Sequence, residues 1–143
     1  MKITQISVFL ENKAGRLAAI TETLAAANIN ISALSIADTS DFGILRLIVD
    51  NPQKAYEVLK AAEFTVSLTE VIGVQMPDVP GGLASVMKAF GELKINIEYL
   101  YAFIGNEVEK ALVVLKVEDI DVAITKLAAS EIQLIEKQEI FGK

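Results

Sequence analysis

The sequence predicts an α+β protein made of two β-α-β-β-α-β units in tandem, each with an antiparallel sheet and both helices on one face. Two observations predict this fold. An internal repeat spans the chain, and strand-like and helix-like hydrophobic patterns follow in the same order in both copies. This order is the one found in ferredoxin-like units. We place the two domains at residues 1–69 and 70–143.

The repeat becomes visible when the sequence is shifted by 66 residues, which brings residues 11–34 onto 77–100. Seven of these 24 positions are identical. The identical pairs are Gly15/Gly81, Leu17/Leu83, Ala18/Ala84, Ile29/Ile95, Asn30/Asn96, Ile31/Ile97 and Leu34/Leu100. Beyond residue 43 the offset becomes 68, which we attribute to a two-residue insertion in the second copy near residues 105–110.

In the first copy, alternating apolar side chains over residues 6–10 predict a strand. Apolar residues at helical spacing follow at positions 17, 20, 24 and 27, and Asn28 is placed to end that helix. The β-branched runs 29–36 and 44–49 flank a polar turn, which is typical of a hairpin. Pro52 then opens a second helix, and residues 64–68 form a last strand.

The second copy repeats this order of elements. We expect strands at 72–76, 95–104, 111–117 and 132–140, and helices over 83–93 and 122–127. Residues 64–76 contain no flexible linker, because Gly73 alone interrupts them. We therefore expect one strand to run nearly into the next and to hold the two halves at a fixed angle.

Composition excludes several classes of function. The 143 residues include no Cys and no His, which excludes disulfides, thiolate metal sites and catalytic dyads built on either residue. Thirteen scattered Lys and Arg against nineteen Asp and Glu leave a formal charge of −6 and no basic patch for nucleic acid. No apolar run approaches the roughly 18 residues that span a membrane. We expect a cytoplasmic protein without a cofactor, a metal or a catalytic residue.

The turn between the first strand and the first helix occurs twice, as ENKAGRL and as PDVPGGL. Gly15 and Gly81 lie where each helix begins, and free N–H groups and the helix dipole favour a ligand carboxylate there. Asn12 and Asp78 can accept a hydrogen bond from a ligand ammonium group. The structural alternative is that these two residues cap the helices as Asx turns and that the glycines only permit close helix–strand packing.

The tripeptide INI also occurs twice, at residues 29–31 and 95–97. Asn is poorly suited to a strand, so its recurrence at one register indicates a specific polar task. Alternation places Asn30 with Ser32, and Asn96 with Glu98, on one face of a strand. The alternative is that each Asn simply occupies the turn after a helix.

Together the segments ENKAGRLAAI…ANINISAL and PDVPGGLASV…LKINIEYL resemble the opening half of ACT domains, the small regulatory modules of amino-acid metabolism. The turn ENKAG is similar to that in the ACT domain of phosphoglycerate dehydrogenase. The resemblance covers essentially the whole chain as a stand-alone tandem pair. It implies that units pair side by side and hold an amino acid between the turn of one unit and the second strand of its neighbour.

Carried over position by position, the resemblance implies a set of ligand-binding residues in each copy. These are Asn12, Lys13, Ala14, Gly15, Arg16, Leu17, Asn30, Ile31 and Ser32, and then Asp78, Val79, Pro80, Gly81, Gly82, Leu83, Asn96, Ile97 and Glu98. The dehydrogenase type has a His where this chain has Leu10 and Met76, so an apolar side-chain pocket is expected. Asp78 stands where that type has Asn, and we expect the two sites to differ in affinity.

Three functions stay open at this point. The first is a non-catalytic regulatory protein, a homodimer that binds an L-amino acid between ACT units and acts on a regulated metabolic enzyme. The second is an adaptor that binds such an enzyme without a ligand of its own, through an aromatic stripe of Tyr99, Tyr101 and Phe103. The third is a small enzyme on the same fold, which the absence of His and Cys argues against.

Overall fold

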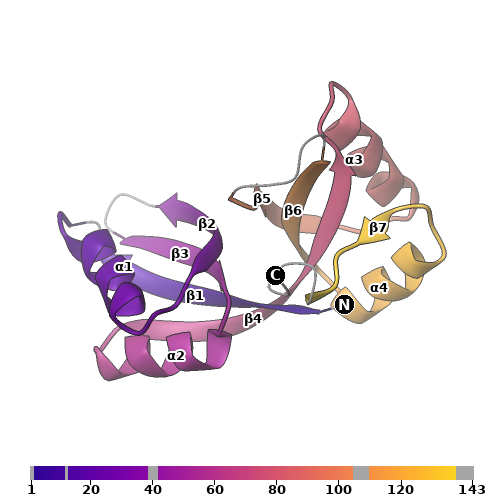
Figure 1. Cartoon of the computed structure of the whole chain (residues 1–143). Helices are drawn as coiled ribbons and strands as arrows, with labels where there is room; N and C mark the ends of the chain where they lie inside the picture. The colour runs from indigo at the N-terminus through magenta and orange to yellow at the C-terminus, as the bar shows by residue number, and fades with distance from the viewer. Residues whose placement is uncertain (1, 12, 39–41, 105–109, 138–143) are drawn as a thin grey trace. The chain divides into compact units, whose positions relative to one another are not determined.

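The computed structural model describes residues 2–11, 13–38, 42–104 and 110–137 (Figure 1). The chain divides into two compact units, Thr4–Thr69 and Glu70–Lys143 with Met1–Ile3, which we call the first and second unit. The predicted α+β class and the ferredoxin-like order of elements are confirmed. The elements are β1 (Ile3–Glu11), α1 (Arg16–Ala26), β2 (Ile31–Asp38), β3 (Phe42–Val49), α2 (Pro52–Ala61), β4 (Thr65–Pro77), α3 (Gly82–Glu92), β5 (Ile97–Ala102), β6 (Lys110–Val117), α4 (Ile120–Ala128) and β7 (Gln133–Leu134).

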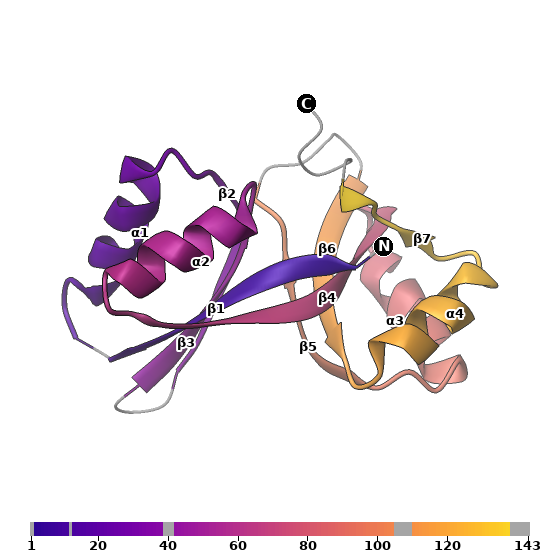
Figure 2. The ribbon, with the colours of Figure 1, turned by 90° about the horizontal axis from the view of Figure 1, so that it is seen from below.

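The sheet of the first unit has the strand order β2-β3-β1-β4, with β3 antiparallel to both of its neighbours. Figures 1 and 2 show α1 and α2 together on one face of this sheet. Helix α1 buries Ile20 and Leu24, and α2 buries Ala55 and Leu59, because residues four apart lie on one side of a helix. These side chains pack on alternate residues of the strands and form one apolar core.

The helices of the first unit end and begin as the sequence predicts. Asn28 adopts a left-handed conformation (φ 59°) directly after α1, which Asn tolerates better than most residues. Pro52 opens α2, and the side chain of Asn51 accepts a hydrogen bond from the Lys54 N–H at 3.2 Å. The described helices have at most eleven residues, and none is long and apolar enough to cross a membrane.

The second unit repeats this arrangement, with the order β5-β6-β4 and β7 on the other side of β4. Strand β4 contains both predicted strands, 64–68 and 72–76, apart from Phe64, so the expectation that one strand runs nearly into the next is confirmed. The predicted strand 132–140 is wrong in length, because the described part of it pairs only over Gln133–Leu134. The side chain of Ile135 lies over Gly73 at the point where this pairing ends. Residues 138–140 lie outside the described part of the chain.

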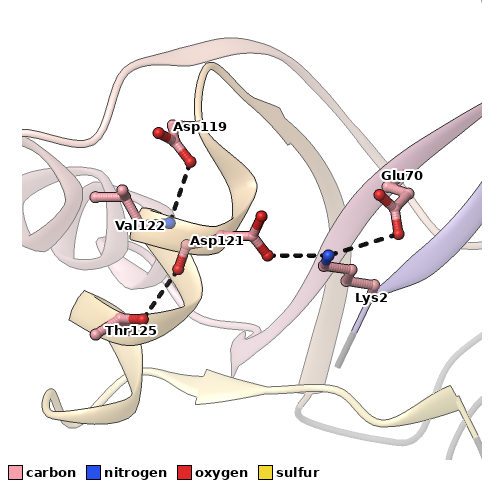
Figure 3. Close-up of polar contacts among 6 residues, drawn as sticks. All are labelled: Lys2, Glu70, Asp119, Asp121, Val122 and Thr125. Atoms are coloured by element: carbon pink, nitrogen blue, oxygen red, sulfur yellow. Dashed lines mark hydrogen bonds and ion pairs between the residues drawn. The ribbon is translucent and has the colours of Figure 1, made fainter.

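The start of β1 groups with the second unit, whereas the sequence analysis assigned residues 1–69 as a whole to the first domain. The Nζ atom of Lys2 lies 2.9 Å from Oδ1 of Asp121 and 3.8 Å from Oε2 of Glu70 (Figure 3). The side chain of Ile3 is buried against Gly73, which has no Cβ to exclude it. An ion pair and an apolar contact therefore attach these residues to the second unit.

Candidate functional site

The glycines of the two duplicated turns have the same backbone conformation. Gly15 and Gly81 both have φ 86°, and their carbonyl oxygens accept the first helical hydrogen bonds, from the N–H groups of Ala19 and Ser85, at 2.9 Å each. An L-residue with a side chain is strained at this φ, and glycine is not. The repeated glycine is therefore required by the turn itself.

Each turn presents free backbone donors at the start of its helix. In the described residues, the N–H groups of Leu17 and Ala18 in α1 have no acceptor, and the same is true of Leu83 and Ala84 in α3. No described side chain caps either helix start. Such donors, together with the helix dipole, suit a carboxylate.

The structural alternatives for the turn residues fare differently. The side chain of Asp78 is exposed and makes no hydrogen bond to any described residue, so the interpretation of it as an Asx cap is wrong. Asn12 lies outside the described residues. A Cβ on Gly15 or Gly81 would meet no described atom within 4 Å, so close packing does not explain these two glycines. Close packing does explain Gly82, where a Cβ would lie 2.2 Å from the Pro77 carbonyl oxygen.

The repeated Asn residues lie just before their strands rather than within them, which corrects the prediction of Asn in a strand. Strand β2 begins at Ile31 and β5 at Ile97, so Asn30 and Asn96 occupy the turn after a helix. Their carbonyl oxygens accept from the Asp50 and Glu118 N–H groups, at 3.2 and 3.1 Å. Both side chains are exposed and have no hydrogen-bond partner among the described residues.

Strand alternation is interrupted after each Asn, which the sequence did not indicate. The pairing register shifts between Ile31 and Ala33 in β2, and between Ile97 and Tyr99 in β5. A bulge of this kind moves the extra residue out of the regular alternation. The inference that Asn30 shares a strand face with Ser32, and Asn96 with Glu98, therefore does not hold. Instead, Glu98 forms an ion pair with Lys116 at 3.3 Å.

Within one unit, the turn and the Asn lie at opposite ends of the same helix. Helix α1 and helix α3 each have 11 residues, and a helix of that length spans about 16 Å. The structure thus brings together Lys13, Ala14, Gly15, Arg16 and Leu17 in one turn. It separates them from Asn30, Ile31 and Ser32. The second unit likewise gathers Asp78, Val79, Pro80, Gly81, Gly82 and Leu83 away from Asn96, Ile97 and Glu98.

The second turn borders a groove of about 650 Å³ that lies entirely within the second unit. Its walls are the first two turns of α3, the end of β4 and the segment that leads from α4 into β7. The lining residues are Gln75, Met76, Pro77, Val79, Pro80, Gly81, Gly82, Ser85, Val86, Ala89, Ser130, Glu131, Ile132 and Gln133. Sequence reasoning named only Val79, Pro80, Gly81 and Gly82 among them as site residues. It missed the others, including the last four, which the offset of 68 aligns with residues 62–65 behind the first turn.

A smaller pocket of about 260 Å³ lies at the other end of α3 and includes Asn96. Charged side chains of both signs line it, among them Lys94, Glu118 and Lys126. The Nζ atom of Lys126 donates to the Leu93 carbonyl oxygen at 2.8 Å, at the C-terminal end of α3. This cation satisfies a helix-end carbonyl and complements the helix dipole, which is a structural role.

Other chemistry is sparse at these sites. The described residues hold no group of three or more His, Cys, Asp or Glu arranged for a metal ion. Beside the first turn, the hydrogen bond and charge of Lys13 lower the pKa of the Glu11 carboxyl, and their atoms lie 2.9 Å apart. In the predicted aromatic stripe, the rings of Tyr99 and Tyr101 stack with centroids 6.4 Å apart, but Tyr101 is only 8% exposed. That ring is therefore a poor contact for an adaptor.

Comparisons with known proteins place this geometry in a family. The family model of the ACT domain pair matches residues 1–142. Protein BT0572 from Bacteroides thetaiotaomicron has a similar crystal structure, with 43% identity, a TM-score of 0.92, and 100% of this chain and 98% of that chain covered. The regulatory subunits of aspartate kinase from Thermus thermophilus and Thermus flavus share the fold, with 19% and 17% identity and TM-scores of 0.64 and 0.61. Both comparisons cover 87% of this chain and 90% of the subunit. No curated protein matches the chain.

Proposed function

The chain belongs to the family of ACT domain pairs, and on that premise we propose that it is a non-catalytic regulatory protein that binds an L-amino acid at an interface between ACT units. The observation that carries this proposal is the duplicated turn. In each unit, one left-handed glycine (φ 86°) precedes a helix whose first N–H groups are exposed and free among the described residues. An amino-acid carboxylate is a ligand of the charge and size that such donors accept.

The second half of the proposed site comes from a neighbouring unit, since one unit separates its turn from its Asn by the length of a helix. The exposed amides of Asn30 and Asn96 have no partner among the described residues and are free to hold a ligand ammonium or side chain. In the second turn, Asp78 favours an ammonium group. The two kinds of site therefore differ in the charge that they present.

Exposed apolar residues at matching repeat positions support pairing between units. Leu34 in β2 and Leu100 in β5 are each 38% exposed, and both lie on strands at the end of their sheet order. Leu17 and Leu83, in the first turn of α1 and of α3, are 37% and 44% exposed. An open sheet edge and exposed leucines are features that a second copy covers well, which supports a homodimer. We also propose a cytoplasmic location and a regulated metabolic enzyme as partner, in keeping with the aspartate kinase subunits that share the fold.

The experiment that tests this function is thermal unfolding of the chain against each of the twenty L-amino acids. A ligand at a hundred times its Kd stabilises the folded state by about 2.7 kcal/mol. For a chain of this size the midpoint rises on the order of 5–10 °C. We expect one amino acid, or a few related ones, to give this shift. A flat panel at millimolar concentration would overturn the proposal and favour the adaptor function.

Variants of the turn locate the site. Gly15→Asn and Gly81→Asn keep a residue type that tolerates the left-handed conformation, while their side chains obstruct the approach of a ligand. We expect these two changes to reduce the ligand-induced shift. Gly91→Ala is the matched control, since Gly91 lies near the end of α3 and a Cβ there meets no described atom within 4 Å. If the two turn variants bind as the control does, the turns are not the site.

A further inference from the structure

The groove of the second unit points to a ligand class of its own: we propose that it binds a small molecule that carries an alkyl chain ending in a guanidinium or ammonium group. This inference goes beyond the proposed function, because the groove lies within one unit and needs no neighbouring unit to complete it. It also needs no ligand carboxylate. Four observations carry it.

The first observation is what the first unit places in the equivalent space. By the repeat, Gly82 corresponds to Arg16 and Ile132 to Phe64, and both residues of the second unit line the groove. In the first unit, the guanidinium carbon of Arg16 lies over the Phe64 ring, 5.0 Å from its centroid. The first unit thus fills this space with an alkyl-guanidinium chain of its own.

The second observation is the burial of that chain. The Nε atom of Arg16 is buried and has no hydrogen-bond partner among the described residues. A cation tolerates this position because its alkyl stem packs on apolar surface and the ring face attracts its charge. The space therefore accepts a cationic chain even without full hydrogen bonding.

The third observation is that the second unit cannot fill the space in the same way. A Cβ on Gly82 would lie 2.2 Å from the Pro77 carbonyl oxygen, closer than backbone geometry permits. No side chain can start from this position without a shift of the backbone. The absence of a side chain at Gly82 keeps the groove open.

The fourth observation is charge complementarity. Among the described residues that line the groove, Glu131 is the single charged one, so a cation meets a carboxylate and no described Lys or Arg. Met76, Val86 and Ile132 offer apolar surface to an alkyl chain. Of the polar side chains, Gln75 and Gln133 bond to each other at 3.3 Å, and the Ser130 hydroxyl donates to the Leu127 carbonyl at 2.7 Å. Glu131 is left as the group that selects for positive charge.

The test is isothermal titration of the full chain with agmatine, which has the alkyl-guanidinium chain of arginine but no carboxylate. We expect one agmatine per chain, and clearly weaker binding of n-butylurea, a neutral chain of similar shape that has neither a cationic end nor a carboxylate. Agmatine reports on the groove alone, because a site that holds an amino acid by its carboxylate does not select it. Binding of agmatine without binding of any amino acid would support this inference and contradict the proposed function. Binding of an amino acid without binding of agmatine would support the proposed function and contradict this inference.

Matched variants sharpen this test. Glu131→Gln should weaken agmatine binding about two- to fivefold, the effect of one exposed ion pair, while Glu63→Gln at the equivalent position of the first unit should leave it unchanged. Ala89→Leu narrows the groove and should abolish binding, whereas Thr23→Leu is its counterpart in α1 and should not. Unfolding midpoints near that of the unmodified chain show that each variant is folded.

Arg16→Ala should add a second agmatine site, and a misfolded variant would not gain binding in this way. Removal of this side chain opens the equivalent space over Phe64, so the stoichiometry should rise from one agmatine per chain to two. The absence of binding at about 10 mM agmatine in both the unmodified chain and Arg16→Ala would overturn the inference. Equal affinity for agmatine and n-butylurea would overturn it as well.

Discussion

The two turns share the backbone conformation of their glycine and differ in the residue that follows it. Both glycines have φ 86°, yet the next residue is Arg16 in one turn and Gly82 in the other. The Arg16 side chain reaches back over Phe64, while the second unit leaves a groove of about 650 Å³ beside Gly82. The same glycine conformation is thus followed by a side chain that fills a space in the first unit and by an open groove in the second.

The other end of each unit shows a similar contrast. The backbone bond from Asp50 to Asn30 has a counterpart from Glu118 to Asn96, at 3.2 and 3.1 Å. The Asp50 carboxylate also accepts from the Asn30 N–H at 3.1 Å. Glu118 is one methylene longer and makes no such bond to any described residue; it lines the pocket that holds Asn96. The backbone hydrogen bond to the Asn is thus the same in both units. The acidic side chain beside it bonds to the Asn N–H in the first unit and lines a pocket in the second.

The largest expected effect on the free energy of unfolding comes from adding a side chain at Gly82. Gly82→Ala forces the backbone away from the Pro77 carbonyl oxygen and should lower the free energy of unfolding by about 2–3 kcal/mol, as in an overpacked core. Urea unfolding followed by circular dichroism measures it. Arg16→Ala is the control at the equivalent position and should cost far less. Similar losses in both variants would show that the two turns do not differ in this way.

The next effect tests whether the two turns are equivalent in their backbone. Gly15→Ala and Gly81→Ala each place an L-residue at φ 86° with no described atom in the way, so each should cost about 1 kcal/mol. The two losses should agree within experimental error in the same urea assay. A much larger loss at one glycine would mean that it also packs closely.

A smaller effect distinguishes the two acids that follow β3 and β6, Asp50 and Glu118. Asp50→Ala removes the acceptor of the Asn30 N–H and should lower the free energy of unfolding by about 0.5–1 kcal/mol. Glu118→Ala removes no hydrogen bond among the described residues and should change it little. Equal losses would contradict the contrast between these two acids.

The attachment of the N-terminus to the second unit gives a pH-dependent effect. A hydrogen bond and the charge of Asp121, and then the charge of Glu70, raise the pKa of Lys2 above its ordinary 10.5. Its contribution is therefore fully present below pH 10.5 and is lost as the pH rises through the folded-state pKa. Lys2→Met should lower the unfolding midpoint slightly at pH 9, and this difference should shrink above pH 10.5. A difference that does not depend on pH would point to lost packing instead.

The smallest expected effect concerns the first turn alone. The Lys13 ammonium lowers the pKa of Glu11, and the second turn has Pro77 and Val79 at these positions and no such pair. The contribution of Glu11 is present above its ordinary pKa of 4.5 and is lost as the pH falls through the lower folded-state value. Glu11→Gln should therefore match the unmodified chain in thermal unfolding at the acid extreme and fall slightly below it near pH 7. Val79→Lys, which gives the second turn a lysine at the matching position, should show no such pH dependence.

The sequence by itself determined the order of the elements and the two turns. Hydrophobic periodicity depends on residues a few positions apart, so it predicts strands and helices without knowledge of the fold. Equally local rules explain three other features. They are the need for glycine at positions 15 and 81, the end of α1 near Asn28, and the continuation of one strand along β4. The repeat then made each element of one copy a check on the other.

Only the tertiary structure decided how these elements form a site. Three features depend on residues that are distant in the sequence or on how closely backbone segments approach. They are the stacking of Arg16 on Phe64, the clash that excludes a side chain at Gly82, and the groove beside Ile132. The same holds for the bulges after Ile31 and Ile97, which arise from strand pairing. After helix α3, Lys94 has a left-handed conformation (φ 57°) that lysine does not favour, in a turn where the N–H groups of Lys94 and Ile95 donate to carbonyl oxygens of the last helical turn. Contacts of this kind have no periodic signal along the chain, and so the sequence predicted the turn but not the space beside it.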